Sequence, residues 1–174
     1  TFYSISNCQE GLSRVTLGNF LIKRVVYEIQ EELPNIKNFG TLSPIPGFRD
    51  WLTTLDETII QSILGKTPYS NISFLKNSNL KIGDGRIVSN KNAIIKLVGH
   101  YLINEKNKKD LPINDVCRFH LGNGAIIDDI VINANVSEVG FNRSFGVMVN
   151  YLYELKNIEK NHEEYINDKK IIVS

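Results

Sequence analysis

Apolar side chains recur at every fourth residue between about residues 15 and 33, and charged residues occupy many of the positions between them. That spacing lays one apolar stripe along a helix, so the pattern predicts a long amphipathic helix. Pro34 follows the last apolar position, and proline ends a helix because it restricts the residue before it. The stripe consists of Leu17, Leu21, Val25, Ile29 and Leu33.

Short runs rich in apolar and β-branched residues predict strands before and after this helix. The first run alternates polar and apolar residues, as a half-buried strand does. Two prolines follow the second run, in Ser43-Pro44-Ile45-Pro46-Gly47, and they predict a rigid, extended path that holds Ser43 at a strand end. The predicted strands are residues 1–6, 36–42, 125–133, 151–155 and 170–173.

Further helices are predicted at residues 54–64, 90–104 and 142–150, with a polar helix at 158–167, and the helix at 90–104 has Ile94, Val98 and Leu102 on its buried side. A shorter helix begins near Pro112 and Asp115, which suit a first turn, and ends at Gly122 and Gly124. That helix places His120 in its last turn. Residues 65–89 are polar and irregular. The alternation of strands and helices predicts an α/β fold with a mixed central sheet flanked by helices.

Composition changes this picture little. The 174 residues fit one domain, and a hydrophobic content of 42% is enough for a core. Lysine plus arginine, 20, nearly balances aspartate plus glutamate, 19, so we expect binding to neither nucleic acid nor membrane. No apolar run approaches the roughly 20 residues that cross a bilayer. The chain opens in a predicted strand without an initiator methionine, so we expect it to lack upstream strands of a longer protein.

The cysteines and histidines do not predict a metal site. Cys8 and Cys117 lie far apart in sequence and are expected to be thiols in a reducing compartment. Cys117 and His120 are spaced as two ligands on one helix, but no second ligand pair accompanies them. His162 lacks the second histidine of a zinc-protease helix, and His100 is expected to serve packing or solvent contact.

The segment that enters the long helix is the natural place for a phosphate group. A helix N-terminus offers unpaired N–H groups and the positive end of the helix dipole. The alternative is that serine and glycine serve only the geometry of the turn. Lys106, Lys108 and Lys109 could meet a further phosphate, or they simply form a solvated loop. The candidate phosphate-binding residues are Ser13, Arg14, Val15, Thr16, Leu17, Gly18 and Asn19.

Five segments, in this order, resemble motifs of the malonyl-CoA decarboxylase family. They are FYSIS at residues 2–6, GNFLIK at 18–23, LSPIPGF at 42–48, RFHLGNGA at 118–125 and MVNYLY at 148–153. The resemblance spans nearly the whole chain and is weakest between about residues 55 and 90, where we expect a family-variable insertion.

The resemblance implies a fold similar to that of the acetyl-CoA-dependent N-acetyltransferases, in which the loop before the first long helix cradles the coenzyme A pyrophosphate. It implies that residues 1–174 are the C-terminal part of a catalytic domain. It also implies that the full-length protein carries an N-terminal helical domain that aids homo-oligomerisation.

By the same resemblance, Ser43 and His120 occupy the two catalytic positions and Tyr153 that of a nearby tyrosine. The implied substrate is malonyl-CoA, and no metal or separate cofactor is implied, because coenzyme A is part of the substrate. Loss of carbon dioxide leaves an enolate, which needs hydrogen-bond donors and then a proton. Histidine titrates near neutral pH, so His120 is a candidate proton donor, while Ser43 could orient the carboxylate or hold the thioester oxygen. The assignment of these two roles stays open.

Other functions compete with decarboxylation. One is an acyl-CoA-dependent acyltransferase, which shares the binding loop and differs in the acceptor. Another is a non-catalytic coenzyme A-binding module, which Thr16 and Arg14 keep open because the family usually has glutamate and glycine there. A serine hydrolase is disfavoured, because Ser43 does not lie in a Gly-x-Ser-x-Gly turn. We expect a cytoplasmic location, with the mitochondrial matrix as the alternative.

Overall fold

The structure is a computed structural model that describes residues 17–36, 38–77 and 79–174, and side chains from residue 24 onward. The strand predicted at residues 1–6 therefore lies outside the described residues. In chain order the elements are α1 (Leu17–Glu32), β1 (Phe39–Pro44), α2 (Phe48–Thr54), α3 (Glu57–Leu64), the 3-10 turns η2 (Tyr69–Asn71) and η3 (Ser73–Lys76), α4 (Gly85–Ser89), α5 (Lys91–Ile103), α6 (Asp115–Gly122), β2 (Ile126–Val131), α7 (Glu138–Ser144), β3 (Met148–Tyr153) and α8 (Ile158–Asp168).

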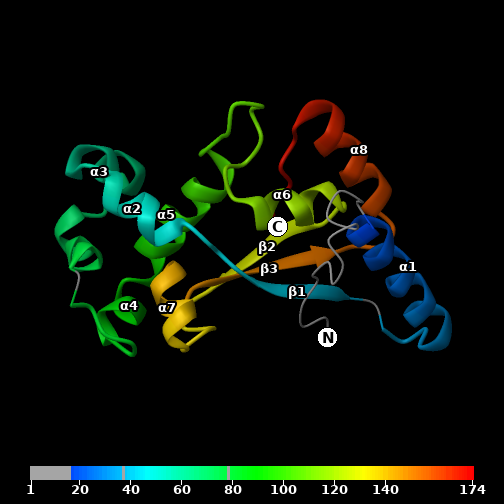
Figure 1. Cartoon of the computed structure of the whole chain (residues 1–174), viewed down its shortest axis with the longest axis horizontal. Helices are drawn as coiled ribbons and strands as arrows, with labels where there is room; N and C mark the ends of the chain where they lie inside the picture. The colour runs from blue at the N-terminus through cyan, green and yellow to red at the C-terminus, as the bar shows by residue number, and fades with distance from the viewer. Residues whose placement is uncertain (1–16, 37, 78) are drawn as a thin grey trace. The chain divides into compact units, whose positions relative to one another are not determined.

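The described strands form one small sheet in the order β1-β3-β2 (Figure 1). It is antiparallel, because the central strand β3 runs opposite to both of its neighbours (Figure 1). The strand predicted at residues 170–173 is reduced to a single parallel bridge between Ile127 and Val173. The α/β class is confirmed. A mixed sheet was predicted, and among the described residues the parallel pairing in this sheet consists of that bridge.

The chain divides into two compact units, neither of which is a continuous stretch. Unit 1 comprises Thr1–Thr41, Phe119–Asp128 and Tyr151–Ser174, and unit 2 comprises Leu42–Arg118 and Asp129–Asn150. Each strand contributes residues to both units. No helix in the described part of the chain is long and apolar enough to cross a membrane.

Unit 2 is a helical cluster built from α2, α3, α4, α5 and α7 (Figure 1). Its core contains the fully buried Leu52, Ile60 and Leu97. An aromatic cluster joins α2 to α5, since Phe48 and Trp51 lie with ring centroids 5.7 and 5.2 Å from that of Tyr101. These contacts pack the helix that follows the Ser43 segment against a long buried helix.

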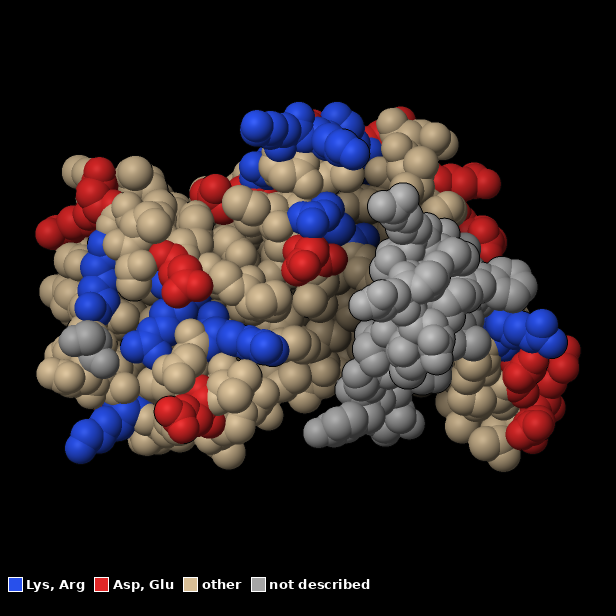
Figure 2. Space-filling model, in the orientation of Figure 1, with Lys and Arg blue, Asp and Glu red and all other residues tan. Residues whose placement is uncertain are grey.

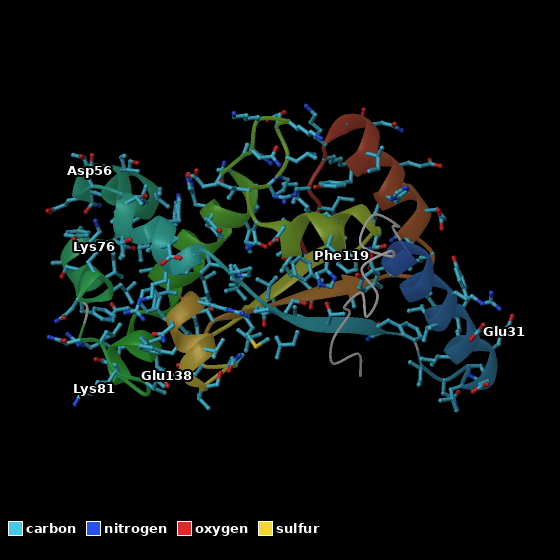
Figure 3. The ribbon with its side chains drawn as sticks, viewed as in Figure 1. Glu31, Asp56, Lys76, Lys81, Phe119 and Glu138 are labelled. Atoms are coloured by element: carbon cyan, nitrogen blue, oxygen red, sulfur yellow. The ribbon has the colours of Figure 1, made fainter. Side chains whose placement is uncertain are left out.

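Two sequence-based boundaries in unit 2 were wrong. The helix predicted at residues 54–64 is α3, which begins only at Glu57 because the side chain of Asp56 (labelled in Figure 3) accepts a hydrogen bond from the Ile59 N–H and caps it there, whereas α2, which ends at Thr54, was not predicted. The helix predicted at residues 142–150 is α7, which ends at Ser144. Phe145 and Gly146 follow with positive φ angles of 56° and 77°, so the helix cannot continue, and β3 begins at Met148.

The stretch predicted to be irregular, residues 65–89, folds into short helical turns, with α4 at its end. Single apolar residues hold these turns, and four of them are buried: Ile72, Leu75, Leu80 and Ile87. By contrast, α1, α5, α6 and α8 lie where helices were predicted from the sequence.

In unit 1 the turn after α6 packs closely against α8. His162 donates its Nδ1 proton to the Gly122 carbonyl at 2.6 Å, and Asn161 donates its amide to the Gly124 carbonyl at 3.2 Å. Gly124 has a φ of 81°, and a side chain there would collide with the Ile158 backbone. The segment that ends the His120 helix is therefore held against α8.

We predict that Gly124→Ala lowers the free energy of unfolding by about 2–4 kcal/mol, because backbone strain and overpacking add. The matched control is Gly83→Ala: Gly83 has a similar φ of 82°, but nothing lies within 4 Å of the place that an added Cβ would take, so only the strain of about 1 kcal/mol is expected. Urea denaturation of both variants measures the difference. Equal losses would contradict the close approach at Gly124.

Candidate active site

His120 lies in the last turn of α6 and is buried, with 5% of its surface exposed. The imidazole stacks on Tyr151, with ring centroids 4.3 Å apart and planes 17° from parallel. Its Nδ1 lies 2.7 Å from the hydroxyl oxygen of Tyr153. Phe119, labelled on α6 in Figure 3, meets the imidazole edge-on at 5.2 Å. Three aromatic rings therefore fix the plane and rotation of the imidazole.

The strand period explains why both tyrosines reach the same histidine. Residues two apart in a strand point to the same face, and burial in β3 alternates so that Tyr151 and Tyr153 are both on the buried face. Tyr151 stacks and Tyr153 forms the hydrogen bond. All of these residues belong to unit 1.

Burial changes the protonation of this pair. Desolvation lowers the pKa of His120 from its ordinary 6.5 to about 4, and burial raises the pKa of the Tyr153 hydroxyl. Both groups are therefore neutral at pH 7. The expectation that His120 titrates near neutral pH was wrong, because a buried imidazole loses the hydration that stabilises its charged form.

The hydrogen bond between these side chains also bears on the imidazole tautomer. If the Tyr153 O–H donates to Nδ1, the imidazole proton lies on Nε2. In the reverse arrangement the buried Tyr153 hydroxyl would need another acceptor for its own proton. The Nδ1 atom of His120 lies 2.7 Å from this hydroxyl and can serve as its acceptor. The geometry thus favours a neutral imidazole with an N–H at Nε2.

Ser43 belongs to unit 2, where it is the penultimate residue of β1 and is 6% exposed. The predicted strand end is confirmed: Pro44 ends β1 and Ile45 is fully buried. The Pro46 carbonyl accepts hydrogen bonds from the Tyr101 hydroxyl at 3.0 Å and from the Asn114 amide at 2.9 Å. The segment after Ser43 is thus anchored at its carbonyl.

The predicted phosphate loop lies mostly outside the described residues, which begin after Ser13, Arg14, Val15 and Thr16. Leu17, Gly18 and Asn19 form the first turn of α1. The N-terminus of α1 therefore lies where the predicted phosphate site requires one, and phosphate binding by these residues stays a prediction.

The remaining histidines and Cys117 have structural surroundings. His100 stacks on Trp51 at 6.1 Å and lies 3.5 Å from a Glu105 oxygen, so its predicted packing role is confirmed. Cys117 is a buried thiol 3.8 Å from the Leu102 carbonyl. Among the described residues, no three histidine, cysteine or acidic side chains gather as metal ligands would.

Basic side chains gather over the loop between α5 and α6, within unit 2 (Figure 2). Lys108 and Lys109 are exposed there, and Lys106 is half-buried. This arrangement fits the solvated loop considered for these lysines.

The sequence analysis missed two residues: Tyr151, which stacks on His120, and Asn114, which bonds the Pro46 carbonyl. Tyr151 could have been found from its position two residues before Tyr153 in a strand. Asn114 directly precedes Asp115 at the start of α6, which is the position that asparagine favours as a helix cap.

The comparisons with known proteins agree along the whole chain. Residues 1–174 match the family described as the malonyl-CoA decarboxylase C-terminal domain. The mitochondrial malonyl-CoA decarboxylase of the goose Anser anser anser is 38% identical over 99% of this chain, and that of Mus musculus is 35% identical over 99%. The chain spans 38% and 39% of the lengths of these relatives.

Solved structures show the same fold. The crystal structure of malonyl-CoA decarboxylase from Rhodopseudomonas palustris matches with a TM-score of 0.86 and 39% identity, covering 99% of this chain and 40% of that one. The enzyme from Agrobacterium vitis matches with a TM-score of 0.84 and 36% identity, covering 99% and 42%.

The low pKa of His120 predicts a loss of stability in acid. Between pH 6.5 and about 4 the unfolded chain binds a proton at this residue that the folded protein does not, so the free energy of unfolding falls as pH falls through that window. The contribution is about 2–3 kcal/mol. Urea denaturation at neutral and acidic pH measures it, with His120→Gln as the comparison. An identical pH dependence in both proteins would contradict the burial of a neutral imidazole.

Proposed function

Because this chain belongs to the malonyl-CoA decarboxylase family, we propose that it carries the active site of an enzyme that converts malonyl-CoA to acetyl-CoA and carbon dioxide. The observation that carries the proposal is the buried pair of His120 and Tyr153, which come from two of the motifs that the family resemblance rests on. The goose and mouse relatives and the bacterial crystal structures are all named as this enzyme.

In the first step the bond between the carboxylate and C2 of the malonyl group breaks, and its electron pair moves onto the thioester oxygen. The enzyme must therefore present donors to that oxygen. A neutral His120 that accepts a hydrogen bond from the Tyr153 hydroxyl at Nδ1 can offer its Nε2 N–H to the developing enolate. Burial strengthens such a hydrogen bond, because no water competes with it.

Tyr153 and Tyr151 act on the substrate through His120 in this proposal. The Tyr153 hydroxyl selects the tautomer, and the Tyr151 ring fixes the plane of the imidazole. A donor that is already oriented costs no reorganisation during the reaction.

The Ser43 hydroxyl is the second proposed donor. It can orient the departing carboxylate or hold the thioester oxygen. Its position before Pro44, in a segment whose Pro46 carbonyl is held by two hydrogen bonds, supports such an oriented role. In the second step C2 of the enolate takes a proton from a neutral hydroxyl or N–H group, and that group regains a proton from water.

Coenzyme A is proposed to bind with its pyrophosphate at residues 13–19. The support is that α1 begins at Leu17, because the first N–H groups of a helix are unpaired and can bind a phosphate. No metal or separate cofactor takes part in the proposed reaction. The fold is proposed to be similar to that of the acetyl-CoA-dependent N-acetyltransferases.

Residues 1–174 are proposed to be the C-terminal part of a catalytic domain, which agrees with the description of the matching family. A helical N-terminal domain and a homo-oligomer stay expectations of the resemblance. The names of the goose and mouse relatives favour the mitochondrial matrix over the cytoplasm as the compartment.

We predict that the intact protein forms acetyl-CoA from malonyl-CoA, as followed by mass spectrometry. His120→Ala is expected to lower kcat by about a hundredfold or more, and Ser43→Ala by at least about tenfold, because each removes a donor used in the transition state. His100→Ala is the matched control: this histidine packs on Trp51, and its loss should change kcat less than about threefold.

The products separate this function from its competitors. Malonyl-CoA left intact by a folded protein that binds coenzyme A would overturn the decarboxylase proposal. Transfer of the malonyl group to an amine or thiol would indicate an acyltransferase, and free coenzyme A with malonate would indicate a hydrolase.

A further inference from the structure

The carbonyl of Pro46 is held by two donors from separate parts of unit 2. The Tyr101 hydroxyl from α5 donates at 3.0 Å, and the Asn114 side-chain amide donates at 2.9 Å. Pro46 lies three residues after Ser43, and the intervening Ile45 is fully buried. A carbonyl with both lone pairs engaged cannot rotate freely, so these bonds fix the segment that carries Ser43.

Asn114 makes a second bond that Tyr101 does not. Its side-chain carbonyl accepts a hydrogen bond from the Cys117 N–H at 2.8 Å, which caps the first turn of α6. The same helix carries His120 in its last turn. Asn114 is 2% exposed, so water does not replace either bond.

One amide group therefore ties two segments together. Its N–H side holds the carbonyl after Ser43, and its C=O side holds the start of the His120 helix. Each bond uses a different end of a planar group, so a movement of one segment is passed to the other. A serine or aspartate at position 114 can still accept the hydrogen bond from the Cys117 N–H, but its side chain has no N–H group to donate to the Pro46 carbonyl.

We propose that Asn114 is a positioning residue of the decarboxylase, which sets the Ser43 segment relative to the start of α6. The proposal rests on the proposed function, since it assumes that Ser43 and His120 act on the substrate. Asn114 itself does not touch the reacting atoms. It acts through the Pro46 carbonyl and the first turn of α6.

The test is the kinetics of Asn114→Ser and Asn114→Asp in the intact protein with malonyl-CoA. Both variants keep the cap of α6 and lose the bond to Pro46. We expect kcat to fall about tenfold or more while KM changes less than about threefold, because misorientation affects the transition state more than binding. Active-site concentration is measured by acetyl-CoA binding, so a lower folded fraction is not mistaken for a lower kcat.

Tyr101→Phe is the matched control, because it removes the other donor to the same carbonyl and keeps the Asn114 side chain that accepts the Cys117 N–H bond. It should lower kcat by less than about threefold. If Tyr101→Phe lowers kcat as much as Asn114→Ser does, the loss of either hydrogen bond to the Pro46 carbonyl is enough to slow the reaction. The positioning role proposed for Asn114 is then wrong.

A double-mutant cycle with Ser43→Ala gives a readout that a purely structural role would not produce. If Asn114 acts by orienting Ser43, its substitution should cost about threefold or less in the Ser43→Ala background, against about tenfold in the wild type. Equal costs in both backgrounds, or variants with the wild-type kcat, would overturn the proposal. A wild-type protein that forms no acetyl-CoA would instead overturn the proposed function.

Discussion

The hydrogen bond between Nδ1 of His120 and the hydroxyl of Tyr153 is the interaction on which the proposed chemistry of this protein depends. It joins the last turn of α6 to β3, and it lies between two side chains that are 5% and 1% exposed. Burial at that level makes the charged forms of both groups costly, so the pair is neutral. The stack on Tyr151 and the packing of α8 against the turn after α6 keep the imidazole in one orientation.

A neutral, oriented imidazole suits a reaction whose difficulty is the placement of negative charge on a thioester oxygen. The proposed site needs no group that titrates near pH 7, because hydrogen-bond donation from Nε2 requires only the neutral form. The other proposed donor, Ser43, sits at a strand end that is followed by two prolines and an anchored carbonyl. Both proposed donors are therefore held by buried contacts.

Periodicity predicted the elements that bury a continuous apolar stripe, and it failed where single contacts decide the structure. The helices α1, α5, α6 and α8 have such stripes or clear end signals. The turns of residues 65–89 are held by a few separate buried apolar residues, which follow no helical or strand period. The end of α7 depends on the positive φ angles of Phe145 and Gly146, and the C-terminal pairing is one bridge at Val173. Local pattern does not encode any of these.

The candidate site was predictable as a set of residues but not as an electrostatic environment. Ser43, His120 and Tyr153 came from ordered motifs, and their chemistry follows from their side chains. The low pKa of His120 could not be predicted, because it depends on rings more than thirty positions away in the sequence. The central claim is that His120 is a neutral imidazole with its proton on Nε2, and NMR of isotope-labelled histidine tests this claim most directly. We expect His120 to stay neutral, with its proton on Nε2, from about pH 8 down to about pH 5. Titration of this residue near pH 6.5, or a proton on Nδ1, would contradict that claim.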